Sequence, residues 1–267
     1  MRRGTWLVVA ALVTAGPASA QVAVNRASQY LFVSDADDAR AVWVNPAGLA
    51  VRREASVYAE FTVRDPGEQG RLGQLAAGFN SRGFSVAYQY DNFGSDITGH
   101  TWRVAMGTGS GPLALGGAVA FYGGDNASEI GWDIGLAYAR ERFTAAMNVA
   151  NIGAPDVRGQ RIATAFVPAM TVLPLAQLAL SVQGRMEDKI TGYGFGAAWN
   201  WSVPFPGAIL ARLDTDRDMR RQSFAFGLSI GARDRGGLVA TTPGDVSDVD
   251  ALSLYGLASR PLENRRR

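Results

Sequence analysis

Cysteine is missing from this chain of 267 residues, and histidine and lysine each occur once, as His100 and Lys189. Without cysteine the chain has no disulfide framework and no site for a lipid-anchored cysteine. If the chain is exported, its stability must come from a packed core or from backbone hydrogen bonds that are closed inside a membrane.

Long hydrophobic runs are also scarce. The clearest one lies near the start, where residues 6–15 are apolar and stand between Met1-Arg2-Arg3 and Ala18-Ser19-Ala20. A basic start, a short apolar stretch and an A-x-A site are typical of a secretory signal peptide, and this stretch is too short to span a bilayer as a helix. We therefore expect residues 1–20 to be a signal peptide that is cleaved near Ala20.

An excess of one charge is absent as well. The formal net charge is +2, and removal of Arg2 and Arg3 with the leader leaves 24 basic and 24 acidic residues. This balance gives no support to nucleic acid as a partner. The last residues, 261–267, are expected to form a solvated basic tail. No low-complexity linker divides the chain, so one folded domain is expected.

From residue 54 onward, apolar side chains recur at every second position. The runs are clearest at residues 55–63, 84–90, 113–121, 132–138, 178–184, 193–201 and 224–230. Turn-forming residues stand between runs, for example Asp65-Pro66-Gly67. Alternation with period two predicts strands, and no convincing helix follows residue 50.

The residues between the apolar positions, which form the second row of each run, distinguish two possible all-β folds. In a soluble sandwich that row faces water and tends to carry Lys, Glu and Thr, whereas here it is mostly Gly, Ala, Ser, Asn and Gln. Small residues suit a crowded barrel interior, and aromatics near strand ends, such as Tyr88 and Tyr122, are typical of interfacial girdles. The favoured fold is an antiparallel transmembrane β-barrel, with the sandwich as the alternative. The outward row is expected to include Phe121, Leu136, Phe195 and Phe226, and the inward row Ala120, Ala137, Gly196 and Ala225.

Two short segments carry a family resemblance. Residues 36–50 read ADDARAVWVNPAGLA, in which Pro46 restricts Asn45 and Gly48 permits a sharp change of direction. Residues 145–153 read AAMNVANIG. The first resembles the N-terminal signature of the FadL-like outer-membrane proteins, including the smaller PorV/PorQ-type branch. The second resembles a strand ending in Asn-Leu-Gly that recurs in this branch.

The resemblance implies an all-β, antiparallel barrel of about 14 strands with a short N-terminal plug segment in its lumen. We expect the plug at residues 21–50 and the transmembrane barrel at residues 51–260, with a last strand at residues 251–259. The expected location is the outer membrane of a Gram-negative-type bacterium, with its lipid as the surroundings. The plug and lumen residues implied by the resemblance are Asn45, Pro46, Ala47 and Gly48.

Two functions stay open. The barrel is expected to pass small hydrophobic molecules across the outer membrane. The alternative is a non-conducting scaffold or a partner of secretion-system proteins, as in the PorV/PorQ-type branch.

Enzyme activity, cofactors and metal sites are not expected. His100 lies in a predicted turn-to-strand region without an accompanying G-x-S-x-G motif. Residues 214–218, DTDRD, lack the central glycine and distal glutamate of a calcium loop and are expected to be a solvated hairpin loop. The glycine-rich residues 107–111 are expected to join two strands, which argues against phosphate binding. The acidic residues Asp35, Asp37 and Asp38 are expected to cap locally or to pair with Arg40.

Overall fold

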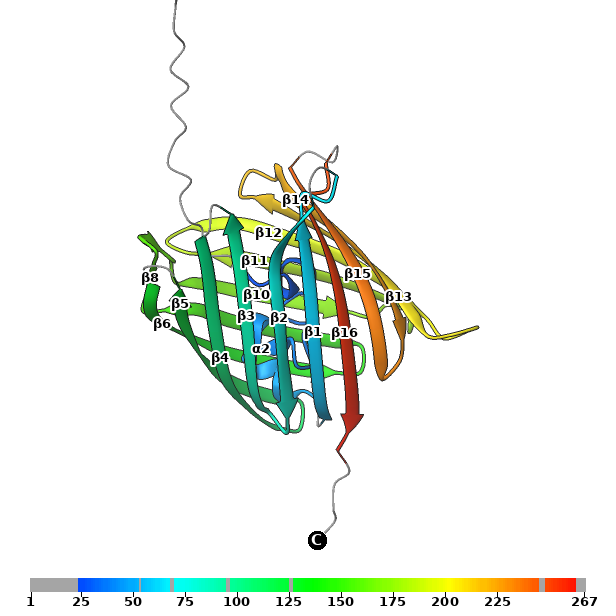
Figure 1. Ribbon diagram of the computed structural model, residues 1–267. Helices are drawn as coiled ribbons and strands as arrows, with labels where there is room; N and C mark the ends of the chain where they lie inside the picture. The colour runs from blue at the N-terminus through cyan, green and yellow to red at the C-terminus, as the bar shows by residue number, and fades with distance from the viewer. Residues whose placement is uncertain are drawn as a thin grey trace, which may run out of the picture.

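The computed structural model describes residues 24–52, 54–67, 70–94, 97–124, 127–244 and 248–262, and in them fourteen strands form a closed antiparallel barrel (Figure 1). The barrel strands are β1 (Glu54–Arg64), β2 (Arg71–Ser81), β3 (Phe84–Gly94), β4 (Ile97–Ser110), β5 (Leu113–Gly124), β6 (Ala127–Arg140), β7 (Phe143–Ile152), β10 (Ala165–Val172), β11 (Leu178–Met186), β12 (Ile190–Trp201), β13 (Gly207–Asp216), β14 (Arg221–Gly231), β15 (Asp234–Pro243) and β16 (Ala251–Pro261). A small hairpin of β8 (Asp156–Val157) and β9 (Gln160–Arg161) stands between β7 and β10.

Each barrel strand pairs with its neighbours in sequence, apart from β7, which pairs with β10, and β1, which pairs with β16 to close the wall. Closure leaves no strand edge with unpaired backbone groups, which is what a lipid environment requires. The expectation of an all-β barrel of about 14 strands is confirmed. We call the end where β1 begins and β16 ends the turn side, and the opposite end the loop side (Figure 1).

Several predicted boundaries need correction. The first strand begins at Glu54, where the alternation was predicted to start, but β16 runs to Pro261, so the final strand extends past residue 259 and into the predicted tail. His100 and residues 107–110 lie inside β4, where they belong to the strand ladder and not to connections. The predicted signal peptide and residues 263–267 of the predicted tail lie outside the described residues.

The alternation of the wall follows the prediction. Phe121 and Phe226 on the outer face are 44% and 49% exposed, whereas their chain neighbours Ala120 and Ala225 are 2% and 3% exposed. A barrel that keeps so many large apolar side chains outside presents a continuous apolar belt, and soluble monomers rarely carry such a surface.

The lumen is not empty. Residues 24–52, which we call the N-terminal segment, lie inside the barrel (Figure 1) and contain α1 (Ala27–Tyr30), α2 (Ala41–Val44) and the 3-10 helix η1 (Pro46–Ala50). The helices α1 and α2 have four residues each and no side-chain cap, and η1 has five residues. Isolated helices of this length do not form in water, so burial against the wall stabilises them. No helix among the described residues is long and apolar enough to cross a membrane.

Candidate functional site: the N-terminal segment in the lumen

A row of wall glycines supports η1. Gly107, Gly116 and Gly135 are register partners on β4, β5 and β6, so they lie side by side. A Cβ at Gly116 would lie 2.3 Å from the carbonyl carbon of Pro46, and a Cβ at Gly135 would lie 1.9 Å from Asn45 Oδ1. At Gly116 and Gly135, only glycine lets the segment approach the wall this closely, whereas the nearest atom to a Cβ at Gly107, the carbonyl oxygen of Pro46, would lie 3.0 Å away. We call these three residues the glycine row.

The turn that rests on this row is closed by the side chain of Asn45. Asn45 Oδ1 accepts a hydrogen bond from the backbone N–H of Ala47 at 3.1 Å, and Asn45 Nδ2 donates to the carbonyl of Val33 at 3.0 Å. Gly48 is packed so tightly that a Cβ there would lie 1.8 Å from the carbonyl oxygen of Ala36. The four residues singled out from the sequence, Asn45, Pro46, Ala47 and Gly48, are all buried inside the barrel. Their role as a plug stays a prediction.

Polar side chains of the wall bind backbone carbonyls of the segment. Each donor comes from a different strand, and an unpaired buried carbonyl would cost about 1–3 kcal/mol. The pairs are Asn80 of β2 with Leu49 (3.3 Å), Arg103 of β4 with Val42 (2.8 Å), Asn148 of β7 with Val44 (3.2 Å) and Arg212 of β13 with Ser28 (2.9 Å). The segment therefore depends on the wall around most of its circumference.

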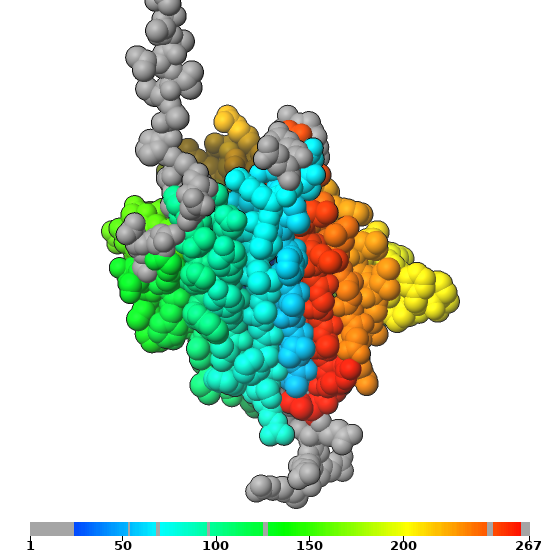
Figure 2. Space-filling model, viewed as in Figure 1, coloured from blue at the N-terminus to red at the C-terminus, as the bar shows by residue number. Residues whose placement is uncertain are grey.

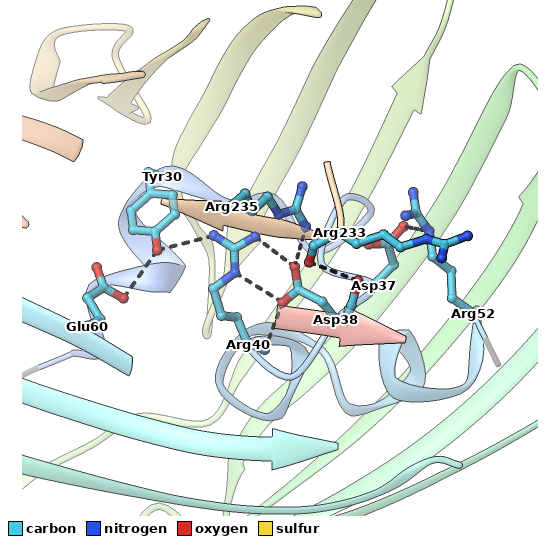
Figure 3. Close-up of polar contacts among 9 residues, drawn as sticks. Tyr30, Asp37, Asp38, Arg40, Arg52, Glu60, Arg233 and Arg235 are labelled. Carbon is cyan, nitrogen blue, oxygen red and sulfur yellow. Dashed lines mark hydrogen bonds and ion pairs between the residues drawn. The ribbon is translucent and has the colours of Figure 1, made fainter. Parts of the chain in front are cut away.

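A buried ion cluster fixes the segment to β15 (Figure 3). Asp38 Oδ2 lies 2.7 Å from Arg40 Nη2 and 2.9 Å from Arg235 Nη2. Burial alone would raise the pKa of Asp38, but the guanidinium of Arg40, aided by Arg235, lowers it to about 2. Nearby, the hydroxyl of Tyr30 donates to Glu60 of β1 at 3.1 Å. Removing one member would leave a buried charge unpaired, so the cluster favours a single position of the segment.

The three acidic residues of the segment have different partners. Asp38 pairs with Arg40, as expected. Asp35 instead accepts hydrogen bonds from the hydroxyls of Thr171 and Ser181 on the wall, and Asp37 pairs with Arg52 at 2.6 Å, so the prediction was wrong for these two. The prediction failed because it considered only partners close in sequence.

On the loop side of the segment lies a cavity of about 640 Å³, between the segment and strands β3–β7 and β10–β13. Every charged side chain that lines it belongs to one of three ion pairs, so its charges are compensated. The pairs are Arg103 with Asp133, Arg185 with Glu187, and Arg212 with Asp214. Asn148, also in the lining, keeps its Oδ1 buried without a hydrogen-bond partner among the described residues. A cavity of this size matches the range of small-molecule pockets.

The wall beside this cavity has a local defect. Pro168 of β10 has no backbone N–H, and the pairing of β10 with β11 passes from Phe166 opposite Met186 directly to Ala169 opposite Gln183. A recess of about 310 Å³ lies there, lined mainly by apolar residues. Gln183 and Tyr193 line both the recess and the luminal cavity, so the two spaces adjoin.

Two other sequence interpretations need correction. Tyr122 lines the luminal cavity, although it was expected in an outer aromatic girdle. Asp214 lies in β13 and pairs with the buried Arg212, so the start of the predicted solvated loop belongs to the lumen. His100 faces Tyr88, whose hydroxyl lies 2.5 Å from its Nδ1.

Within the described part of the chain, no group of three or more Asp, Glu or His side chains is placed to hold a metal ion. The expectation of no enzyme activity, cofactor or metal stays a prediction.

The glycine row and the carbonyl donors were missed by sequence reasoning. The signal was present, because glycine occupies the second row at Gly107, Gly116 and Gly135, but only the register of β4, β5 and β6 aligns them.

No protein-family model and no curated protein matches the chain. The FadL-like resemblance therefore stays a prediction. Among solved structures, the barrel is similar to the Pseudomonas putida toluene transporter TodX, with a TM-score of 0.51, 9% identity, and coverage of 87% of this chain and 96% of that one. The Acinetobacter baumannii outer membrane protein Omp33 gives a TM-score of 0.47 at 7% identity, covering 80% and 100%. A KdgM porin gives 0.42 at 9% identity, covering 78% and 99%. At such low identity, the similarity to TodX shows the fold alone.

Proposed function

We propose that this protein is an outer-membrane barrel that passes small molecules and that its N-terminal segment gates the lumen. The observation that carries the proposal is the position of the segment, which fills the lumen on the turn side of the 640 Å³ cavity. A solute that enters the cavity from the loop side can continue along the axis only if the segment moves. The apolar outer belt supports placement in a membrane.

We further propose that the passing molecules are small and hydrophobic. The apolar recess beside Pro168 supports this class, because it adjoins the cavity and faces the lipid side of the wall. The polar lining of the cavity opposes it, since an apolar solute would strip water from polar groups at a cost of about 1–3 kcal/mol for each one left unpaired. A flux assay must therefore compare an apolar probe, such as toluene, with a neutral sugar.

The second candidate is a non-conducting scaffold or a partner of secretion-system proteins. It is favoured by the number and burial of the contacts that hold the segment, which include carbonyl bonds from four strands and the Asp38 cluster. A segment held this firmly closes the lumen under resting conditions.

A reversible crosslink separates the two candidates, because the natural chain has no cysteine. A Cβ at Gly107 would lie 3.2 Å from the Cβ of Ala50, so the segment need shift by only a few tenths of an ångström to reach the roughly 3.5–4.5 Å that a disulfide spans. In the double variant Gly107→Cys/Ala50→Cys, oxidation locks η1 to β4. If the segment is a gate, oxidation should abolish solute flux into liposomes, and reduction should restore it.

A matched control crosslinks the wall to itself. A Cβ at Gly109 would lie 3.6 Å from the Cβ of Ala114, its register partner on β5. The variant Gly109→Cys/Ala114→Cys should conduct equally when oxidised and reduced. If the wild type conducts and the oxidised Gly107→Cys/Ala50→Cys variant conducts equally well, gating by the segment is contradicted. Absence of flux in every form, together with co-purifying proteins from native outer membrane, would favour the scaffold.

A further inference from the structure

Two neighbouring hairpin tips on the turn side differ from the rest of that rim. The tips that join β2 to β3, β6 to β7 and β14 to β15 carry Arg82, Glu141 and Arg233 respectively. The tip between β12 and β13, residues 202–206, reads SVPFP, and the tip between β10 and β11, residues 173–177, reads LPLAQ. Neither contains a charged side chain. The tip between β4 and β5, Gly111-Pro112, is also uncharged but has no large apolar side chain, so the two neighbouring tips at residues 173–177 and 202–206 form the apolar sector of the turn-side rim.

The side chains of this sector are exposed. Val203 is 81% exposed, Leu175 is 52% exposed and Phe205 is 49% exposed. Residues 203–206 form four consecutive exposed apolar residues, a run that is not expected at a water-facing turn unless it has a function. In Figure 2 the β12–β13 hairpin, in yellow, projects beyond the wall.

The two tips form one surface that continues from the belt. The backbone N–H of Asn200, near the end of β12, donates to the carbonyl of Gln177 in the β10–β11 tip at 2.7 Å, so the two hairpins lie side by side at this end. Directly above, Trp199 and Ile209 are register partners on the outer face and are 44% and 39% exposed. The apolar belt thus runs onto the tip without an intervening charge. An apolar surface that binds a protein usually has a polar rim, whereas an apolar surface at the membrane boundary is typically accompanied by tryptophans.

We propose that the β12–β13 and β10–β11 tips are embedded in the lipid of the membrane, while the charged tips of the same rim stand in water. The partner is therefore the bilayer itself, which would hold this side of the barrel deeper than the opposite side. This inference rests on the membrane placement in the proposed function, but it does not depend on transport.

The cysteine-free chain allows a direct test by single-cysteine spin labelling. Three variants, Val203→Cys, Ala232→Cys and Phe226→Cys, would be refolded into vesicles of phosphatidylethanolamine and phosphatidylglycerol. Collisions of each label with oxygen, which concentrates in lipid, would be compared with collisions with a water-soluble nickel chelate. Phe226 is the lipid reference on the wall, and Ala232 is the matched control on the charged β14–β15 tip.

The label at Val203 should resemble the label at Phe226 and differ from the label at Ala232. If it resembles the label at Ala232 while Phe226 reports lipid, the tip stands in water and the inference fails, although the barrel is in the membrane. If Phe226 also reports water, the membrane placement fails and the inference fails with it. A label at Leu175→Cys should repeat the result for Val203.

Discussion

Adding one methyl group to the glycine row should dislodge the N-terminal segment and leave the barrel closed. In Gly116→Ala the new Cβ would lie 2.3 Å from the carbonyl carbon of Pro46, 2.4 Å from its oxygen and 2.5 Å from the nitrogen of Ala47. All three are backbone atoms, so no side-chain rotation relieves the contact. To reach an ordinary contact of at least 3.4 Å, η1 must move away from the wall by roughly an ångström.

The cost follows from what that shift disturbs. Overpacking of this kind costs about 1–3 kcal/mol. The hydrogen bonds from Asn148 to Val44 and from Asn80 to Leu49 are already 3.2 and 3.3 Å long, so the same shift would stretch them beyond bonding range. Each contributes about 0.5–1.5 kcal/mol net, which brings the expected loss in docking free energy to roughly 2–6 kcal/mol.

Trypsin provides the assay, because the segment contains Arg26, Arg40 and Arg52. In Gly116→Ala the segment should be cleaved faster than in the wild type, while the barrel keeps its heat-modifiable migration on gels. The control is Gly117→Ala, one residue along on the outer face, where a Cβ would meet nothing closer than 3.8 Å. Equal cleavage of the two variants would refute the docking of η1 on the glycine row.

Three further outcomes are expected. Because the pKa of Asp38 is lowered from 3.8 to about 2, its contribution to docking, about 2 kcal/mol, should be present above pH 4 and lost as the pH falls toward 2. Pepsin, which is active at low pH, replaces trypsin in this assay. Burial raises the pKa of Asp35, so its contribution to docking changes with pH in the opposite direction. The loss of docking at low pH is assigned to Asp38 and should therefore be smaller in Asp38→Asn. Replacing Arg40 by Met leaves Asp38 paired with Arg235 alone among the described residues, and it should weaken docking by about 3 kcal/mol at neutral pH. The control Arg82→Met, on an exposed tip, should leave tryptic cleavage of the segment unchanged. On the outer face, Phe226→Arg should make folding into bilayers less favourable by about 2–4 kcal/mol in a folding titration, and Phe226→Leu should not. Equal effects of the two substitutions would contradict the assigned outer row.

The local sequence pattern was sufficient to predict which side chains of the wall face outward. The period of two placed Phe121, Leu136, Phe195 and Phe226 outside, because successive side chains of a strand must point to opposite faces. It also identified the turn at Asn45, since the restriction that Pro46 imposes on its neighbour is local. Strand ends were less well defined, as at residues 107–110 and Pro261, because glycine and proline can extend a strand when pairing partners are present.

The sequence by itself therefore determined the strands with the clearest alternation, their two faces and the all-β class. The tertiary structure alone decided how the lumen is filled. Asp38 meets Arg235 across 197 residues, and Arg212 meets Ser28 across 184. Gly107, Gly116 and Gly135 become one row only through the register of three strands. The physical reason is that closure of the barrel brings distant strands around one segment, and no spacing within a single strand encodes which wall residues will face it.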